Sequence, residues 1–89
     1  MKFKLTATVL LIAGLLPSSA WAGTDVAFDD LPPVVQKTIE REVKTGTIED
    51  IEWEADARVP HYDVEYSLDG VEWELDVAPD GRVLRHEQD

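Results

Sequence analysis

Acidic side chains alternate with apolar ones on both sides of Asp69-Gly70, and these carboxylates are the groups of the chain best suited to chemistry. Residues 62–68 and 71–77 both follow this alternation. Because successive side chains of a β-strand point to opposite faces, the carboxylates of such a segment share one face. A face of carboxylates can attract cations or a basic surface on another protein.

The turn between these two segments predicts which carboxylates face each other. Asp-Gly is a favoured two-residue hairpin loop, because both central residues of a type I′ turn need positive φ angles. With this loop, Glu65 lies opposite Glu74, and Asp63 lies opposite Asp76. On the other face the register predicts four apolar pairs: Leu68 with Val71, Tyr66 with Trp73, Val64 with Leu75, and Tyr62 with Val77.

Residues 48–55 alternate in the same way and predict a third strand of the acidic face. Aligning Trp53 with Val64 keeps all apolar residues on one side. Glu52 then lies beside Glu65, and Glu54 lies beside Asp63. A four-residue last loop would set Arg85 beside Glu74. The predicted partner-binding residues are Glu52, Glu54, Asp63, Glu65, Glu74 and Asp76.

Three interpretations of this face stay open at the level of sequence. The simplest is a solvated polar face, which antiparallel sheets commonly have. The second is a surface that binds a basic protein. The third is a divalent-cation site, for which His61, Asp63 and Glu54 are the candidate ligands because they share the face. Calcium takes about six to eight oxygens, often from loops, and a flat sheet spaces its carboxylates widely. We therefore expect no resident metal or other cofactor.

The chain also lacks the usual combinations for catalysis. After residue 22 its only serine is Ser67, and there is no cysteine. Ser67 falls on the exposed strand face without an expected histidine partner, so nucleophilic catalysis has no candidate set of residues. General acid catalysis needs a carboxyl in an apolar pocket, and these carboxyls lie on an open sheet. We expect a protein that is not an enzyme.

The first 22 residues have the features of a secretory signal peptide. Lys2 and Lys4 precede an apolar run over residues 5–16, which is too short to span a bilayer. Ala20-Trp21-Ala22 fits the small-x-small cleavage rule, so cleavage is predicted before Gly23. We therefore expect a single domain over residues 23–89 that is periplasmic or secreted, without membrane insertion after cleavage.

The charge of the predicted mature chain restricts its partners. Residues 23–89 contain six Lys or Arg residues and all 19 Asp or Glu residues, which gives a net charge of −13. Nucleic acids and anionic membrane surfaces are both excluded as partners, because each needs a basic footprint on the protein. The charge favours cations or a basic protein surface.

The elements that position the acidic face are a helix and a sheet. Asp29 and Asp30 are predicted to cap a helix that begins with two prolines and ends at Gly46. Its apolar stripe, which includes one threonine, consists of Leu31, Val34, Val35, Thr38, Ile39 and Val43. Strands are predicted at 48–55, 62–68, 71–77 and 82–87, after a loose lead-in at 23–28. The predicted fold is α+β, with one N-terminal amphipathic helix packed on a four-stranded antiparallel meander sheet.

The order of these elements resembles the PepSY and PepSY-like domains of exported bacterial proteins, a group likened to the β-lactamase inhibitor fold. The motifs that carry the resemblance are LPPVV at 31–35, IEDIE at 48–52, YDVEY at 62–66, WELDV at 73–77 and DGRVL at 80–84. The resemblance covers nearly all of residues 31–87. It implies a non-catalytic module that binds or regulates proteases or other envelope proteins, and it supplies no catalytic residues. The acidic face departs from the family pattern.

Overall fold

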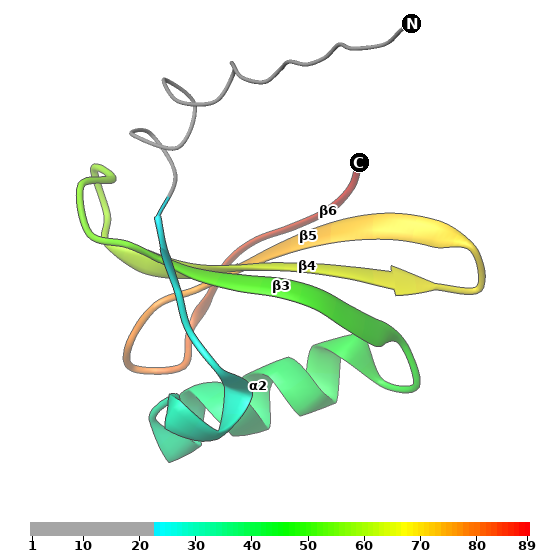
Figure 1. The fold of residues 1–89 in the computed structure, drawn as a ribbon, viewed down its shortest axis with the longest axis horizontal. Coiled ribbons are helices and arrows are strands. Elements are labelled where there is room, and N and C mark those ends of the chain that lie inside the picture. The colour runs from blue at the N-terminus through cyan, green and yellow to red at the C-terminus, as the bar shows by residue number, and fades with distance from the viewer. Residues whose placement is uncertain (1–22) are drawn as a thin grey trace, which may run out of the picture.

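The computed structural model describes residues 23–89, and the predicted signal peptide, residues 1–22, lies outside this range. The described chain places one helix against one face of a five-stranded antiparallel sheet (Figure 1). The fold is therefore α+β. No helix within residues 23–89 is long and apolar enough to cross a membrane.

The five strands follow one another through the sheet in chain order. They are β2 (Thr24–Asp25), β3 (Thr47–Glu54), β4 (His61–Leu68), β5 (Val71–Val77) and β6 (Val83–Gln88). Between β2 and β3 the chain forms a 3-10 turn, η1 (Phe28–Asp30), and the helix α2 (Pro33–Val43). Strands β3 to β6 make the predicted antiparallel meander.

Strand β2 corrects the prediction of four strands and an N-terminal helix. Thr24 and Asp25 pair with β3, and the Val26 N–H donates to the Ile51 carbonyl oxygen at 2.9 Å. The predicted lead-in is thus an edge strand, and the helix follows it. Two residues are too short for a recognisable alternation, so only their pairing with β3 identifies them as a strand.

The core lies between α2 and the apolar face of the sheet. Val35 and Ile39 are fully buried on the helix, and they pack in one cluster with buried residues of β3, β4 and β5. Val34, expected on the same stripe, is 45% exposed. Thr38 is buried, and its hydroxyl lies 2.7 Å from the Gly81 carbonyl oxygen and 3.2 Å from that of Val34. Donation to Gly81 ties the helix to the loop between β5 and β6.

Both ends of α2 differ from the sequence prediction. Asp29 and Asp30 lie in η1 rather than at the cap, and Pro32 takes the cap position without a side-chain hydrogen bond. Residues before a proline disfavour helical dihedrals, so Leu31 and Pro32 are extended between η1 and α2, and the helix is shorter than expected. At the other end Lys44, rather than Gly46, has the positive φ angle, 59°.

The central hairpin has the predicted turn and register. Asp69 and Gly70 have φ angles of 53° and 82°, as a type I′ turn requires. All six predicted pairs between β4 and β5 are present. Tyr66 is buried and its ring stacks on that of Trp73, with 6.3 Å between centroids. The apolar face of the hairpin therefore points toward α2, and the carboxylates point away from it.

Gly81 provides a stability test of the contact between α2 and the last loop. Its φ angle is 93°, and a Cβ there would lie 2.7 Å from a methyl carbon of Val34. We expect Gly81→Ala to destabilise the protein by about 2–3 kcal/mol, from left-handed strain and from overpacking together. Gly70→Ala is the matched control, because Gly70 also has a positive φ but nothing lies within 4 Å of its Cβ position. Chemical denaturation measures both, and equal losses would contradict the contact.

Candidate functional site

The face of the sheet opposite α2 bears two rows of carboxylates, which we call the acidic face. Strand pairing defines each row, because paired residues lie side by side across neighbouring strands. One row is Asp25, Glu52, Asp63 and Asp76, and it ends at Arg85. The other row is Asp50, Glu65, Glu74 and Glu87.

The central part of each row is as predicted, but the register of β3 is not. Glu65 faces Glu74 and Asp63 faces Asp76. Glu52, however, pairs with Asp63 rather than with Glu65, and Glu54 pairs with His61 rather than with Asp63. A slip of two residues keeps every side chain on its predicted face, so the apolar pattern could not distinguish the two registers.

Two local features accompany the observed register of β3. The rings of Trp53 and Tyr62 come together, with centroids 4.8 Å apart, and such aromatic pairs stabilise neighbouring strands. The pairing also shifts between Ile48 and Asp50, where β3 has a bulge. Asp50 lies opposite Glu65 in the same register that pairs Glu52 with Asp63, so the two-residue slip, and not the bulge, brings Asp50 into the row.

Arg85 lies opposite Asp76, not opposite Glu74 as predicted, because the last loop, residues 78–82, is one residue longer than predicted and the pairing of β5 with β6 shifts again between Asp76 and Val77. Its guanidinium nevertheless reaches both carboxylates. Nη2 is 2.7 Å from Glu74 Oε2, and Nε is 3.1 Å from Asp76 Oδ2. Arg85 therefore neutralises part of both rows from the edge of the sheet.

Three carboxylates gather at the centre of the acidic face, and we call Asp63, Glu74 and Asp76 the inner cluster. Each offers an oxygen within 4.8 Å of the others. Asp76 is only 7% exposed. Asp63 Oδ1 and Asp76 Oδ1 are buried without a hydrogen-bond partner. Unpaired buried carboxylate oxygens are costly, so this cluster favours a proton or a cation between its members.

The environment of the inner cluster changes the acidity of Asp63. Burial, which is the largest cause, and the charges of Glu74 and Asp76 together raise the pKa of Asp63 to about 7. Burial also raises the pKa of Glu65, with a contribution from Asp50. Asp63 therefore takes up a proton near neutral pH.

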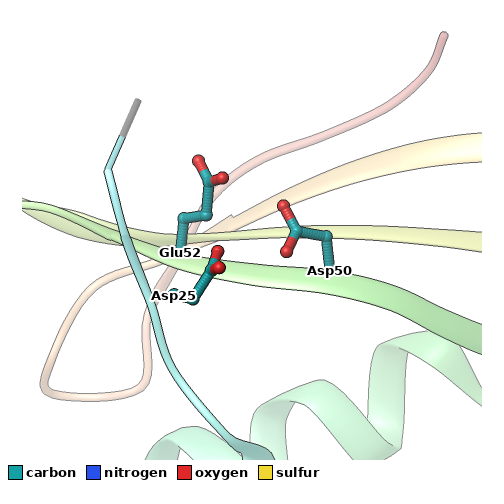
Figure 2. A group of neighbouring side chains, drawn as sticks. All are labelled: Asp25, Asp50 and Glu52. Atoms are coloured by element: carbon teal, nitrogen blue, oxygen red, sulfur yellow. The ribbon is translucent and has the colours of Figure 1, made fainter. Parts of the chain in front are cut away.

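A second group, which we call the edge cluster, lies where β2 joins β3. It consists of Asp25, Asp50 and Glu52, whose side chains stand on the side of β3 away from α2 (Figure 2). Burial, which is the largest cause, and the charge of Asp50 together raise the pKa of Glu52 to about 7. Sequence reasoning missed Asp25 because it falls in the predicted lead-in, and it missed Asp50 because the predicted register of β3 did not place it beside Glu65.

The residues proposed as metal ligands are only partly brought together. His61 Nδ1 lies 2.7 Å from the Val59 carbonyl oxygen, and its Nε2 lies 3.5 Å from Asp76 Oδ2. Within residues 23–89, Asp63 groups with Glu74 and Asp76 rather than with His61 and Glu54. An ion on this face would therefore be held by carboxylate oxygens, which are the ligands of hard cations.

The arrangement can bind positive charge, and its rows extend across most of the sheet. Comparisons of the chain with protein-family models, with curated proteins and with solved structures find no match. The resemblance to PepSY-like domains therefore depends on the order of the motifs in the chain itself.

Proposed function

We propose that the chain is a small exported, non-catalytic binding or regulatory module of the PepSY-like kind, periplasmic or secreted. Its acidic face would bind a basic surface of a partner protein, such as a protease or another envelope protein. The observation that supports this proposal is the pair of carboxylate rows on the sheet face opposite α2. An extended acidic surface suits a macromolecular partner better than a small substrate.

The electrostatics of the acidic face argue for a partner of opposite charge. Within residues 23–89, Arg85 is the only arginine or lysine whose ion pairs involve this face; the others join Arg41 to Glu42 and Arg82 to Asp80. Like charges on neighbouring strands destabilise the free protein. A basic surface would relieve that repulsion and would also accelerate association.

The test compares two variants with the same change of charge. One neutralises the acidic face with Asp50→Asn, Glu65→Gln and Glu72→Gln; Glu72 pairs with Ser67 of β4 and lies on the same face of β5 as Glu74. The control neutralises the helix side with Asp29→Asn, Asp30→Asn and Glu40→Gln. Chain 23–89 and both variants are immobilised, and the retained proteins of a periplasmic extract are quantified. We expect the face variant to lose about tenfold in retention and the control to lose little. Equal retention by the two variants would refute the role of the face.

The alternative function is a response to divalent cations, and the inner cluster is the observation that favours it. Three carboxylates share a space that a single calcium ion could bridge, and two of their buried oxygens have no partner. Thermal melting in calcium, magnesium and sodium chloride at matched ionic strength separates the two functions. A gain specific to one divalent ion, lost in Asp63→Asn, supports the cation function; equal gains from all three salts indicate screening alone.

A further inference from the structure

A groove lies along the edge of β3 next to β2. Its volume is about 380 Å³. Val26 and Phe28 line it and also pack against the edge of the core. The lining is apolar at Val26, Phe28, Ile48 and Ile51, and acidic at Asp25, Glu49 and Asp50.

This groove adjoins a length of β3 that has a strand neighbour on one side only. Strand β2 pairs with Trp53 and Glu52, and its contact with β3 ends at the hydrogen bond from Val26 to Ile51. The chain then turns down into η1 and α2 (Figure 1). Within residues 47–50, Thr47, Ile48 and Asp50 pair with β4 around the bulge at Glu49, and no strand of the described chain lies on the other side. An unpaired edge is a template for an added strand.

The residues around this edge select what kind of strand can be added. Ile48 is 36% exposed beside the groove. The edge cluster, Asp25, Asp50 and Glu52, stands on the face of the sheet away from α2 (Figure 2), and Asp25 and Asp50 also line the groove. A second copy of this chain would bring carboxylates against carboxylates, which opposes pairing. A segment with basic residues on one face and apolar residues on the other would match both surfaces.

We propose that the groove and residues 47–50 bind an extended segment of the partner as an additional strand of the sheet, next to β3 and beyond β2. Its alternate apolar side chains would enter the groove over Ile48 and Phe28, and its basic side chains would face the edge cluster. Main-chain hydrogen bonds to β3 would supply affinity, and the alternating side chains would supply specificity. This inference rests on the proposed function, because it names the part of a basic partner that is bound.

Peptide binding tests the inference directly. The probe is a fluorescent peptide of roughly eight residues in which lysine and valine alternate, and the control has the same composition with the lysines in one block. We expect the alternating peptide to bind at least tenfold more tightly. Two further probes carry N-methyl groups on one edge or on the other edge of the strand. Only one edge of an added strand bonds to β3, so one isomer should lose binding and the other should keep it.

Matched protein variants locate the site. Ile48→Lys places a positive charge at the β3 edge, and Val83→Lys places the same charge at the opposite edge, on β6; both residues are about equally exposed. We expect at least a tenfold loss with Ile48→Lys and little change with Val83→Lys. The inference is overturned if Val83→Lys has the larger effect, if both N-methyl isomers bind alike, or if the alternating peptide binds no better than the block control.

Two further results separate this inference from the function on which it depends. If retention from extract depends on the acidic face but Ile48→Lys does not reduce it, strand addition is wrong and the proposed function stands. If neither the face variant nor Ile48→Lys changes retention, both are wrong. Sedimentation of the free protein tests a second copy as the occupant, and a dimer that Ile48→Lys dissociates would overturn the proposal.

Discussion

Asp63→Asn raises the stability of the protein, and raises it more at pH 8 than at pH 5. Burial and two neighbouring carboxylates raise the pKa of Asp63 to about 7 in the folded state. In an unfolded chain the pKa of an aspartate is about 3.9. The folded state therefore binds a proton that the unfolded state lacks between these values. The stability from this proton is complete at low pH and is lost as the pH rises through about 7.

Asparagine copies the shape of protonated Asp63 and carries no charge at any of these pH values. At pH 5 the folded wild type is protonated at Asp63 but its unfolded chain is already ionised there, so the variant has only a small advantage. At pH 8 the wild-type carboxylate is also ionised in the folded state beside Glu74 and Asp76, and the advantage of the variant should be larger than at pH 5 by about 1–2 kcal/mol after allowance for screening by solvent. In a domain of this size that corresponds to a rise in Tm of roughly 4–15 °C.

The measurement is a thermal or urea melt of both proteins at several pH values. Asp29→Asn is the control, because it removes the same charge from the exposed turn η1 on the helix side. Glu52, whose pKa is also raised to about 7, contributes the same pH trend to every variant. A stabilisation by Asp63→Asn that is equal at pH 5 and pH 8 would show that Asp63 does not titrate near neutrality.

Arg85→Gln produces the second large effect, in the opposite direction. The Arg85 guanidinium forms an ion pair with Asp76, whose side chain is 10% exposed, and another with Glu74. Removing one partner of a buried pair costs about 3–5 kcal/mol, whereas exposed pairs contribute about 0–1 kcal/mol. Arg85 itself is half-exposed, so we expect a loss of about 2 kcal/mol.

Arg82→Gln is the matched control for this loss. Arg82 forms an ion pair with Asp80 in the preceding loop, and both side chains are exposed. That pair should contribute less than about 1 kcal/mol. A double variant, Arg85→Gln with Asp76→Asn, should recover part of the loss, because no buried charge is then left unpaired. If Arg85→Gln costs no more than Arg82→Gln, Arg85 does not compensate the inner cluster.

Together these two predictions describe how a small domain tolerates its own acidic face. Arg85 supplies one positive charge, and protonation of Asp63 removes one negative charge. Both compensations are partial, since Glu65, Asp50 and Glu72 lie outside the ion pairs of Arg85. A basic partner would complete the compensation.

The central hairpin and its carboxylate pairs followed from the sequence alone. Asp69 and Gly70 require a two-residue loop with positive φ angles, and such a loop permits one register between β4 and β5. Strict alternation then assigns each side chain to a face. The pairs Glu65–Glu74 and Asp63–Asp76, and the helix that covers the apolar face, were predictable for these local reasons.

Tertiary structure decided the rest of the site, because the remaining registers depend on contacts between distant segments. The longer loop before β4 permits registers that differ by two residues, and the packing of Trp53 on Tyr62 accompanies the one observed. That register brought Asp50 into its row, and pairing with β3 made a strand of Thr24 and Asp25. The burial of Asp76 requires neighbours from several strands at once, so the alternation of residues along one strand cannot reveal it.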